Sequence, residues 1–263
     1  MSEARRYFRI WVRMAAMSLG AQTSHPLGSI GFLLGKLIRI FFFFAFVIAI
    51  FRNVRSLGGY DLAQMALFFL TFNLVDLSAQ ILFRGIYGAR RVVEEGEFDF
   101  YLTQPCSPLF RLMFSTLDFL DLATILPVLA LLAEVFRRFP GFGFSRYLIY
   151  SLLTANGIAI AMAIHVMVAG LAVRTQELEN SVWVYRDLMF MGKFPTDIYG
   201  RTARLALTFL VPVAVMCTFP AKAFLGTLSP AWAAYSLALC AGLLALSRWY
   251  WLNSVERYTS SSS

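Results

Sequence analysis

The residues that could do chemistry in this sequence are acidic and amide side chains placed inside long apolar runs. Asp76 shares the spacing i, i+3, i+7 with Asn73 and Gln80, so a helix would put all three on one face. Asp118 and Asp121 lie three residues apart in the next apolar run. Ionisable groups are costly in lipid, so these residues mark either a transport path or contacts between helices.

The depth of these groups favours contacts between helices. By the helix rise, Asp76 lies about 12 Å and Asp118 about 10 Å from the inner boundary of the membrane. Arg39, in the first apolar run, reaches a comparable depth. We therefore expect Arg39 to pair with Asp76, Asp118 or Asp121. The alternative is that this intramembrane polar stripe lines a cargo path or relays a motion.

The motifs of catalysis are missing from the sequence. It contains no Gly-x-Ser-x-Gly elbow, no His-Glu-x-x-His and no phosphate-binding GxxxxGK[ST] loop. The three cysteines include no CxxC pair, so a zinc site or a disulfide framework is not expected. We expect no catalytic residue, metal or cofactor in this chain.

The composition indicates a membrane protein. Of 263 residues, 59% are hydrophobic and 14% are charged, and the mean hydropathy is +0.67. Soluble domains carry about 25% charged residues, so a soluble fold and a disordered chain are both excluded. The net charge of +8 comes from basic residues at the ends of apolar runs. This placement indicates membrane orientation, and no nucleic-acid partner is expected.

The apolar runs predict an all-α membrane protein with six transmembrane helices. The fifth is marginal and contains Pro212, and the apolar stretch 220–230 after it predicts a bent or re-entrant segment. The expected transmembrane domain covers residues 30–252, with spans at about 30–51, 62–83, 112–134, 147–173, 203–219 and 231–252.

The segments around this domain predict its orientation. Residues 1–29 contain a basic amphipathic helix, at residues 4–19, that would lie in the inner interface. With the N-terminus in the cytoplasm, 17 of the 23 lysines and arginines fall on the inner side, including those of the inner loops 84–111 and 174–202. We expect a multi-pass protein of the cell (plasma or inner) membrane with both termini, including the tail 253–263, cytoplasmic.

The loop 84–111 is the most informative inner segment. Basic residues mark its start, an acidic cluster follows, and Pro105 and Pro108 break the chain before the third span. A short helix between such breaks could present a rigid face to a cytoplasmic partner. The alternative is a solvated charged loop.

This loop carries a family resemblance that extends along the chain. Residues 95–105 resemble the G-x-(hydrophobic)-D-x-x-L-x-x-P signature of a branch of the ABC-2-type exporter permeases. Gly96, Asp99, Leu102 and Pro105 lie on its positions, and Leu109 on the hydrophobic position after it. Residues 194–199 (FPTDIY) are similar to the F-P-x-x-I-Y stretch of that branch. Further matches are Pro212 and Pro220 and the closing residues 258–260 (YTS).

The resemblance implies the ABC-2-type exporter fold and its partners. Such permeases pair with a second permease, identical or related, and rest on separate ABC ATPase subunits that bind ATP and Mg²⁺. The N-terminal helix would be the connecting helix, and the segment after the fifth span would hold re-entrant helices. A cytoplasmic coupling helix would contact the ATPase through Glu94, Glu95, Gly96, Glu97, Asp99, Leu102, Pro105 and Leu109.

Two other functions stay open at this point. An ion-coupled carrier or channel would need no ATPase, but the two halves of the chain do not match as inverted repeats would. An intramembrane enzyme is the less favoured alternative, because its motifs are missing. The sequence does not identify the cargo, and export is implied only by the resemblance.

Overall fold

The computed structural model describes residues 3–175 and 179–259, and every element there is helical, as the composition predicts. The longer helices are α1 (Glu3–Thr23), α2 (Pro26–Phe51), α3 (Leu62–Phe83), α7 (Phe119–Arg137), α8 (Phe144–Thr175), α9 (Glu179–Phe190) and α12 (Pro230–Glu256). The shorter ones are η1 (Arg84–Gly88), α4 (Ala89–Glu94), α5 (Glu97–Thr103), α6 (Pro108–Met113), η2 (Met191–Lys193), η3 (Thr196–Ile198), α10 (Arg201–Leu205), η4 (Ala206–Leu210), η5 (Ala214–Thr218) and α11 (Phe219–Leu225).

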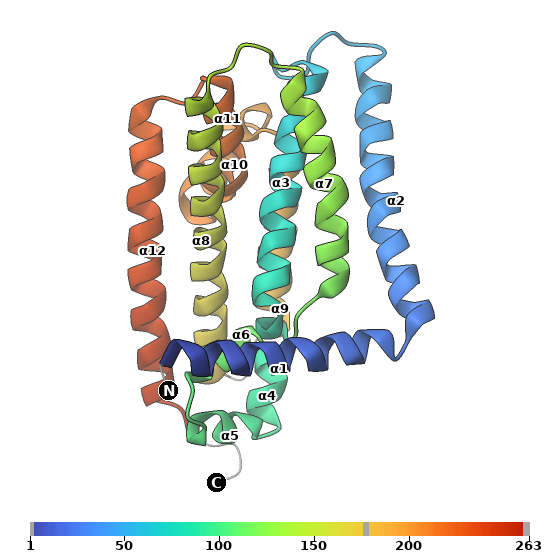
Figure 1. Cartoon of the computed structure of the whole chain (residues 1–263). Coiled ribbons are helices and arrows are strands. Elements are labelled where there is room, and N and C mark those ends of the chain that lie inside the picture. Colours follow the sequence, from blue (N-terminus) through green and yellow to red (C-terminus); the bar gives the residue numbers. More distant parts are fainter. Residues whose placement is uncertain (1–2, 176–178, 260–263) are drawn as a thin grey trace.

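In the part of the chain that the structure describes, five helices are long and apolar enough to cross a membrane: α2, α3 with its extension to Glu94, α7, α8 and α12. They stand side by side, and α1 lies across one end of the bundle (Figure 1). We call this the α1 end. The opposite end, where residues 52–61 join α2 to α3, is called the far end. The chain is therefore a multi-pass membrane protein.

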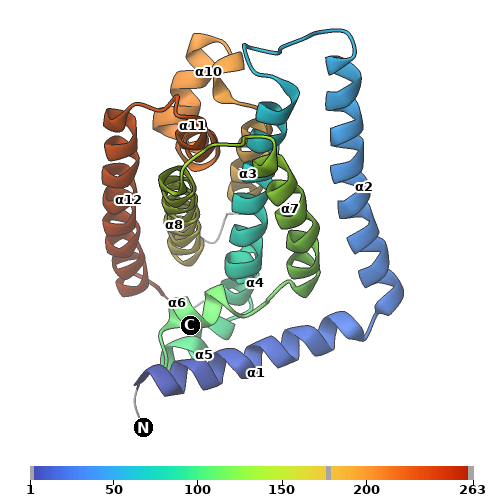
Figure 2. The same cartoon turned by 45° about the horizontal axis from the view of Figure 1, so that its top comes forward.

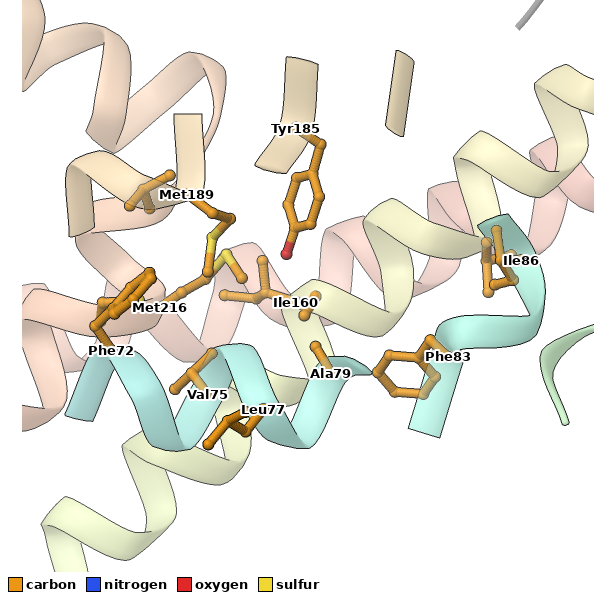
Figure 3. Close-up of a cluster of buried hydrophobic side chains, with 14 of the residues drawn as sticks. Phe72, Val75, Leu77, Ala79, Phe83, Ile86, Ile160, Tyr185, Met189 and Met216 are labelled. Carbon is orange, nitrogen blue, oxygen red and sulfur yellow. The ribbon is translucent and has the colours of Figure 1, made fainter. Parts of the chain in front are cut away.

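Helix α3 is the centre of the bundle. It begins at a capping box, in which Asp61 accepts the backbone N–H of Gln64 and the Gln64 side chain accepts the N–H of Asp61. Side chains on all its faces are buried. Figure 3 shows part of this core, where Phe72 and Val75 of α3 lie beside Met216, and Ile160 of α8 is nearby. Lipid tails are as apolar as these side chains, so the hydrophobic effect does not drive the helices together in a membrane. Close packing of this kind holds them together instead.

The fifth passage between the two ends differs from the expectation. It is made by α9 and η2 and not by residues 203–219. The chain from α9 to η3 runs along α3 in the opposite direction. Three contacts define this path: Arg186 with Gln80, Phe190 with Phe72, and Asp197 with Tyr60. The residue numbers rise in the segment after α8 and fall towards the start of α3, so the two run antiparallel. Arg186, Asp187 and Lys193 lower the hydropathy of this stretch, which is why a search for apolar runs passes over it.

Residues 201–225 form a bent pair of helices at the far end. The two halves meet at 86°, with the break between Leu210 and Ala214, where Pro212 has no N–H to continue a helix. Lys222 near its end forms a 2.7 Å ion pair with Asp197 just before its start, so the pair enters and leaves at the same end. The re-entrant element thus begins near residue 201, whereas the expectation placed it at 220–230. Arg201 and Arg204, expected on the inner side, belong to the far end (Figure 1).

One close approach holds this re-entrant hairpin in the bundle. A Cβ atom at Gly157 of α8 would lie 2.5 Å from the carbonyl oxygen of Met216. Only glycine lets the two backbones come this near. At the far end, Arg146 at the start of α8 donates to the carbonyl oxygen of Phe224 at 3.2 Å.

The third membrane helix begins later than expected. The sequence predicts a span from residue 112, but α6 ends at Met113 and α7 begins at Phe119. Asp118 is the N-cap of α7 and accepts the backbone N–H groups of Leu120 at 3.0 Å and Asp121 at 3.2 Å. Asp118 therefore lies at the start of α7 and not inside a membrane helix, as a span from residue 112 would have placed it. Helix α12 likewise continues to Glu256, into the stretch expected as a tail.

Candidate functional site

The loop 84–111 folds into a helical elbow beyond the α1 end. Helix α3 leaves the bundle through η1 and α4, the chain turns at Gly96, and α5 lies across the end farthest from the bundle (Figures 1 and 2). Gly96 has φ +73°, a left-handed conformation that favours glycine. The chain then returns through α6. A short helix, α5, is present in this loop, but it lies between the turn at Gly96 and Pro105 and not between the two prolines.

Helix α5 has one buried and one exposed face. Phe98 and Tyr101 are buried, and Phe98 makes edge-to-face contacts with Trp251 in the last turns of α12 and with Tyr258 just after it. The opposite face carries Phe100, whose side chain is among the more exposed large apolar groups of the chain, at 69%. The buried side chains of Phe98 and Tyr101 hold α5 against the bundle, and Phe100 points away from the bundle.

Three exposed acidic side chains precede Phe100 in the elbow. Glu94 and Glu95 are exposed and form ion pairs with Arg90 and Arg91 at 2.6 and 3.5 Å, of the surface type that contributes little to stability. Glu97 is exposed at the start of α5. We call Glu94, Glu95, Glu97 and Phe100 the elbow face.

The other residues expected to contact an ATPase differ in their exposure. Leu102 and Pro105 are exposed next to the elbow face, whereas Asp99 and Leu109 are half-buried. Leu109 packs against the core of the bundle. Phe100 was missed by the sequence reading. The buried aromatics two residues before it and one after it are the signal that could have found it.

The chain returning from α5 is attached to helix α1. The hydroxyl of Tyr7 accepts the backbone N–H of Ser107 at 2.9 Å, and its ring makes an edge-to-face contact with Phe110. Farther along α1, Ser18 accepts the N–H of Leu117 at 3.1 Å. Any movement of α5 and α6 would therefore reach α1.

Gln22 of α1 binds the break before α7. Its side chain donates to the carbonyl oxygen of Leu117 at 2.6 Å and accepts the N–H of Phe119 at 3.1 Å. These bonds satisfy backbone groups that the break leaves without helical partners. On the other side of the elbow, a Cβ at Gly85 would clash with the carbonyl oxygens of Leu112 and Met113. Helix α6 therefore lies directly against η1.

A buried ion-pair cluster joins three elements at the α1 end. Arg84 contacts Asp118 at 2.9 Å and Asp121 at 3.7 Å, and Lys36 contacts Asp118 at 3.7 Å and donates to Asp121. The Asp121 side chain has no exposed surface. The cluster connects α2, the end of α3 and the start of α7.

The prediction that Arg39 pairs with one of these acids was wrong. Lys36 and Arg84 make the ion pairs, and in the described residues Arg39 forms no hydrogen bond or ion pair within 4 Å. Arg39 lies one turn beyond Lys36, and its charge acts on Asp76 at longer range. Lys36 interrupts the same apolar run as Arg39, so the sequence was equally compatible with a pair between Lys36 and an acid of the third run.

The polar stripe of α3 is bound within the bundle. Asn73 donates to the Phe69 carbonyl of its own helix at 2.8 Å, and Gln80 donates to Asp76 at 2.8 Å. Gln80 also accepts from Arg186 of α9 at 3.3 Å. Gln80 therefore joins the stripe to α9, whereas the bonds of Asn73 and Asp76 stay within α3.

The ion pair of Asp197, at the far end, was not predicted from the sequence. Asp197 accepts from the hydroxyl of Tyr60 at 2.7 Å and pairs with Lys222 at 2.7 Å. Burial by itself would raise the pKa of Asp197, but the hydrogen bonds from Lys222 and Tyr60 outweigh it and hold that pKa below its usual value.

Comparisons with known proteins agree with this arrangement. A family model described as ABC-2 family transporter protein matches residues 37–262, which is most of the chain. The comparisons with curated proteins and with solved structures gave no significant match.

Proposed function

Since the chain belongs to the ABC-2 family of transporter proteins, we propose that it is the permease subunit of an ATP-driven exporter. The ATP and Mg²⁺ would be bound by a separate ABC ATPase subunit, and a second permease, identical or related, would complete the translocation path. The α1 end would face the cytoplasm, with both termini, in the cell (plasma or inner) membrane.

The elbow face is the observation that carries this proposal. It lies at the extreme of the α1 end, and it combines one exposed aromatic side chain with three exposed acids. Protein interfaces typically have an apolar anchor inside a polar rim, so the elbow face fits a groove with an apolar floor and basic edges. The ATPase would supply that groove.

The contacts behind the elbow supply a route for its motion. A push on α5 would move α6 and the break at 114–118, which is bound to α1 by Ser18 and Gln22. The same break ends at Asp118, which is paired with Lys36 of α2 and with Arg84. ATP-driven movement would thereby reach the first and third membrane helices.

Copurification tests the docking surface. Tagged chain is purified from its native membranes, and the bound ATPase is quantified for wild type and for the triple variant Glu94→Gln, Glu97→Gln, Phe100→Ala. We expect the triple variant to lose at least about tenfold of the bound ATPase, since one interface anchor is worth about 2 kcal/mol or more.

A matched control is available at the far end. Glu134 is a half-exposed acid paired with Arg137 and Arg138, and Phe144 is 80% exposed. The variant Glu134→Gln, Phe144→Ala should retain the ATPase. Equal retention by both variants would refute docking at the elbow face, and cargo movement by the chain alone in liposomes would favour the ion-coupled carrier.

A further inference from the structure

A cavity lined by cations lies between α2, α3 and α9 near the α1 end. Its volume is about 430 Å³. Three helices and the start of η1 turn basic or amide side chains towards it. Its lining includes Lys36, Arg39, Gln80, Arg84 and Arg186.

The acids around this cavity do not neutralise it. Asp76, Asp118 and Asp121 lie behind its wall, and none of them lines it. Lys193 lies close enough to Arg39 and Asp76 for their charges to act on it. Four cations line the cavity, Lys36, Arg39, Arg84 and Arg186, against three acids behind its wall, which leaves an excess of one positive charge even without Lys193. At membrane depth such an excess is costly unless an anion enters.

Arg39 is the cation whose acceptors are missing. Among residues 3–175 and 179–259 it has no hydrogen bond or ion pair, whereas Lys36 and Arg84 are held by Asp118 and Asp121. A guanidinium presents five N–H donors in a planar fork that matches a phosphate with two parallel bonds.

The wall formed by α2 leaves room for a ligand with an apolar tail. Gly31 and Gly35 line the cavity, and a Cβ added at either would meet nothing within 4 Å. The Phe32 ring beside them is 44% exposed, and Ile38 on the same helix is 51% exposed. The cavity thus adjoins an uncovered apolar helix surface of the kind that faces acyl chains.

We propose that this cavity binds a phosphate-bearing anion, with Arg39 as its principal ligand and Lys36, Arg84 and Arg186 as supporting charges. The apolar surface of α2 makes the headgroup of an anionic lipid from the leaflet at the α1 end the favoured source. Free phosphate is the other source with the same chemistry. This inference goes beyond the transport function and does not depend on an ATPase.

Lipid binding by the full chain tests the site. The purified chain in neutral detergent is titrated with phosphatidylglycerol or phosphatidylcholine, and bound lipid is counted by native mass spectrometry. We expect wild type to bind phosphatidylglycerol preferentially and Arg39→Gln to bind it about tenfold more weakly, because hydrogen bonds to a charged group are lost. Arg52→Gln, at the other end of the same helix, should bind like wild type.

Two further arms complete the test. Inorganic phosphate that displaces the lipid at millimolar concentration would assign the site to soluble phosphate, and failure to displace it would assign the site to the lipid headgroup. Both results support a phosphate site. Equal phosphatidylglycerol binding by Arg39→Gln and wild type would overturn the proposal, as would wild-type binding without preference over phosphatidylcholine. Thermal unfolding of each variant shows that it is folded.

Discussion

The buried ion-pair cluster should carry a large share of the stability at the α1 end, and Asp121→Asn tests this. The substitution keeps the shape of the side chain and removes its charge. Asp121 has no exposed surface, and Lys36 is only 9% exposed. Removing one partner of a buried ion pair costs about 3–5 kcal/mol, because the other charge stays buried.

The geometry places the expected loss at the low end of this range. Asp118 would remain 3.7 Å from Lys36, and Arg84 is 30% exposed, so both cations keep some compensation. We expect a loss of about 3 kcal/mol. At about 2–4 °C per kcal/mol for a chain of roughly this size, the unfolding midpoint should fall by about 6–12 °C.

The assay is thermal unfolding of the purified chain in detergent without added lipid, followed by tryptophan fluorescence. Arg39→Gln is the control, and it should shift the midpoint little because Arg39 belongs to no ion pair in the described residues. The double variant Lys36→Met, Asp121→Leu should recover most of the loss, since replacing a whole buried pair by apolar groups is often neutral. Unchanged unfolding of Asp121→Asn, or an equal loss in Arg39→Gln, would refute the reasoning.

Three further predictions concern close backbone approaches and the far-end acid. Gly157→Ala should push the re-entrant hairpin away from α8, so the buried thiol of Cys217 should react faster with a maleimide, whereas Cys240 should not; unchanged Cys217 labelling would contradict the close approach. Gly85→Ala should separate η1 from α6 and lower the unfolding midpoint by about 2–8 °C, the effect of about 1–2 kcal/mol of overpacking, and an equally stable variant would argue against this contact. Because the pKa of Asp197 is depressed, its ion pair stabilises the fold above the pKa of a free aspartate, about 3.9, and this contribution is lost as the pH falls through the lower folded pKa. Asp197→Asn should therefore be less stable than wild type by a constant amount between pH 5 and 7, and the two should converge in strong acid; a gap that widens on acidification would contradict the sign.

The sequence predicted the elements whose signal is local. Long apolar runs gave α2, α3, α8 and α12, and the acidic stretch closed by Pro105 and Pro108 gave the elbow with α5. Hydropathy and proline placement depend on neighbouring residues only, so the printed sequence is enough to read them.

The sequence misplaced the elements whose character depends on their neighbours. The fifth passage contains Arg186, which donates to Gln80 of α3, and Lys193. Its low hydropathy therefore does not show how deep it lies in the bundle. The second half of the bent hairpin, residues 214–225, is apolar and mostly buried in protein, whereas Leu205, Phe209 and Leu210 of the first half are exposed. A search for spans reads the whole apolar stretch as a crossing. Nothing in the spacing decided between Lys36 and Arg39 as the partner of Asp121, because residues three apart lie on the same face of α2 and differ mainly in depth.

The central claim is that an ATPase docks on the elbow face, and photocrosslinking tests it most directly. A photoreactive amino acid replaces Phe100, or Phe144 at the far end as the control, in the full chain in its native membrane. The account predicts that the adduct formed from position 100 contains an ABC ATPase and that position 144 gives none. An ATPase adduct from position 144, or none from position 100 in a complex that still holds the ATPase, would contradict it.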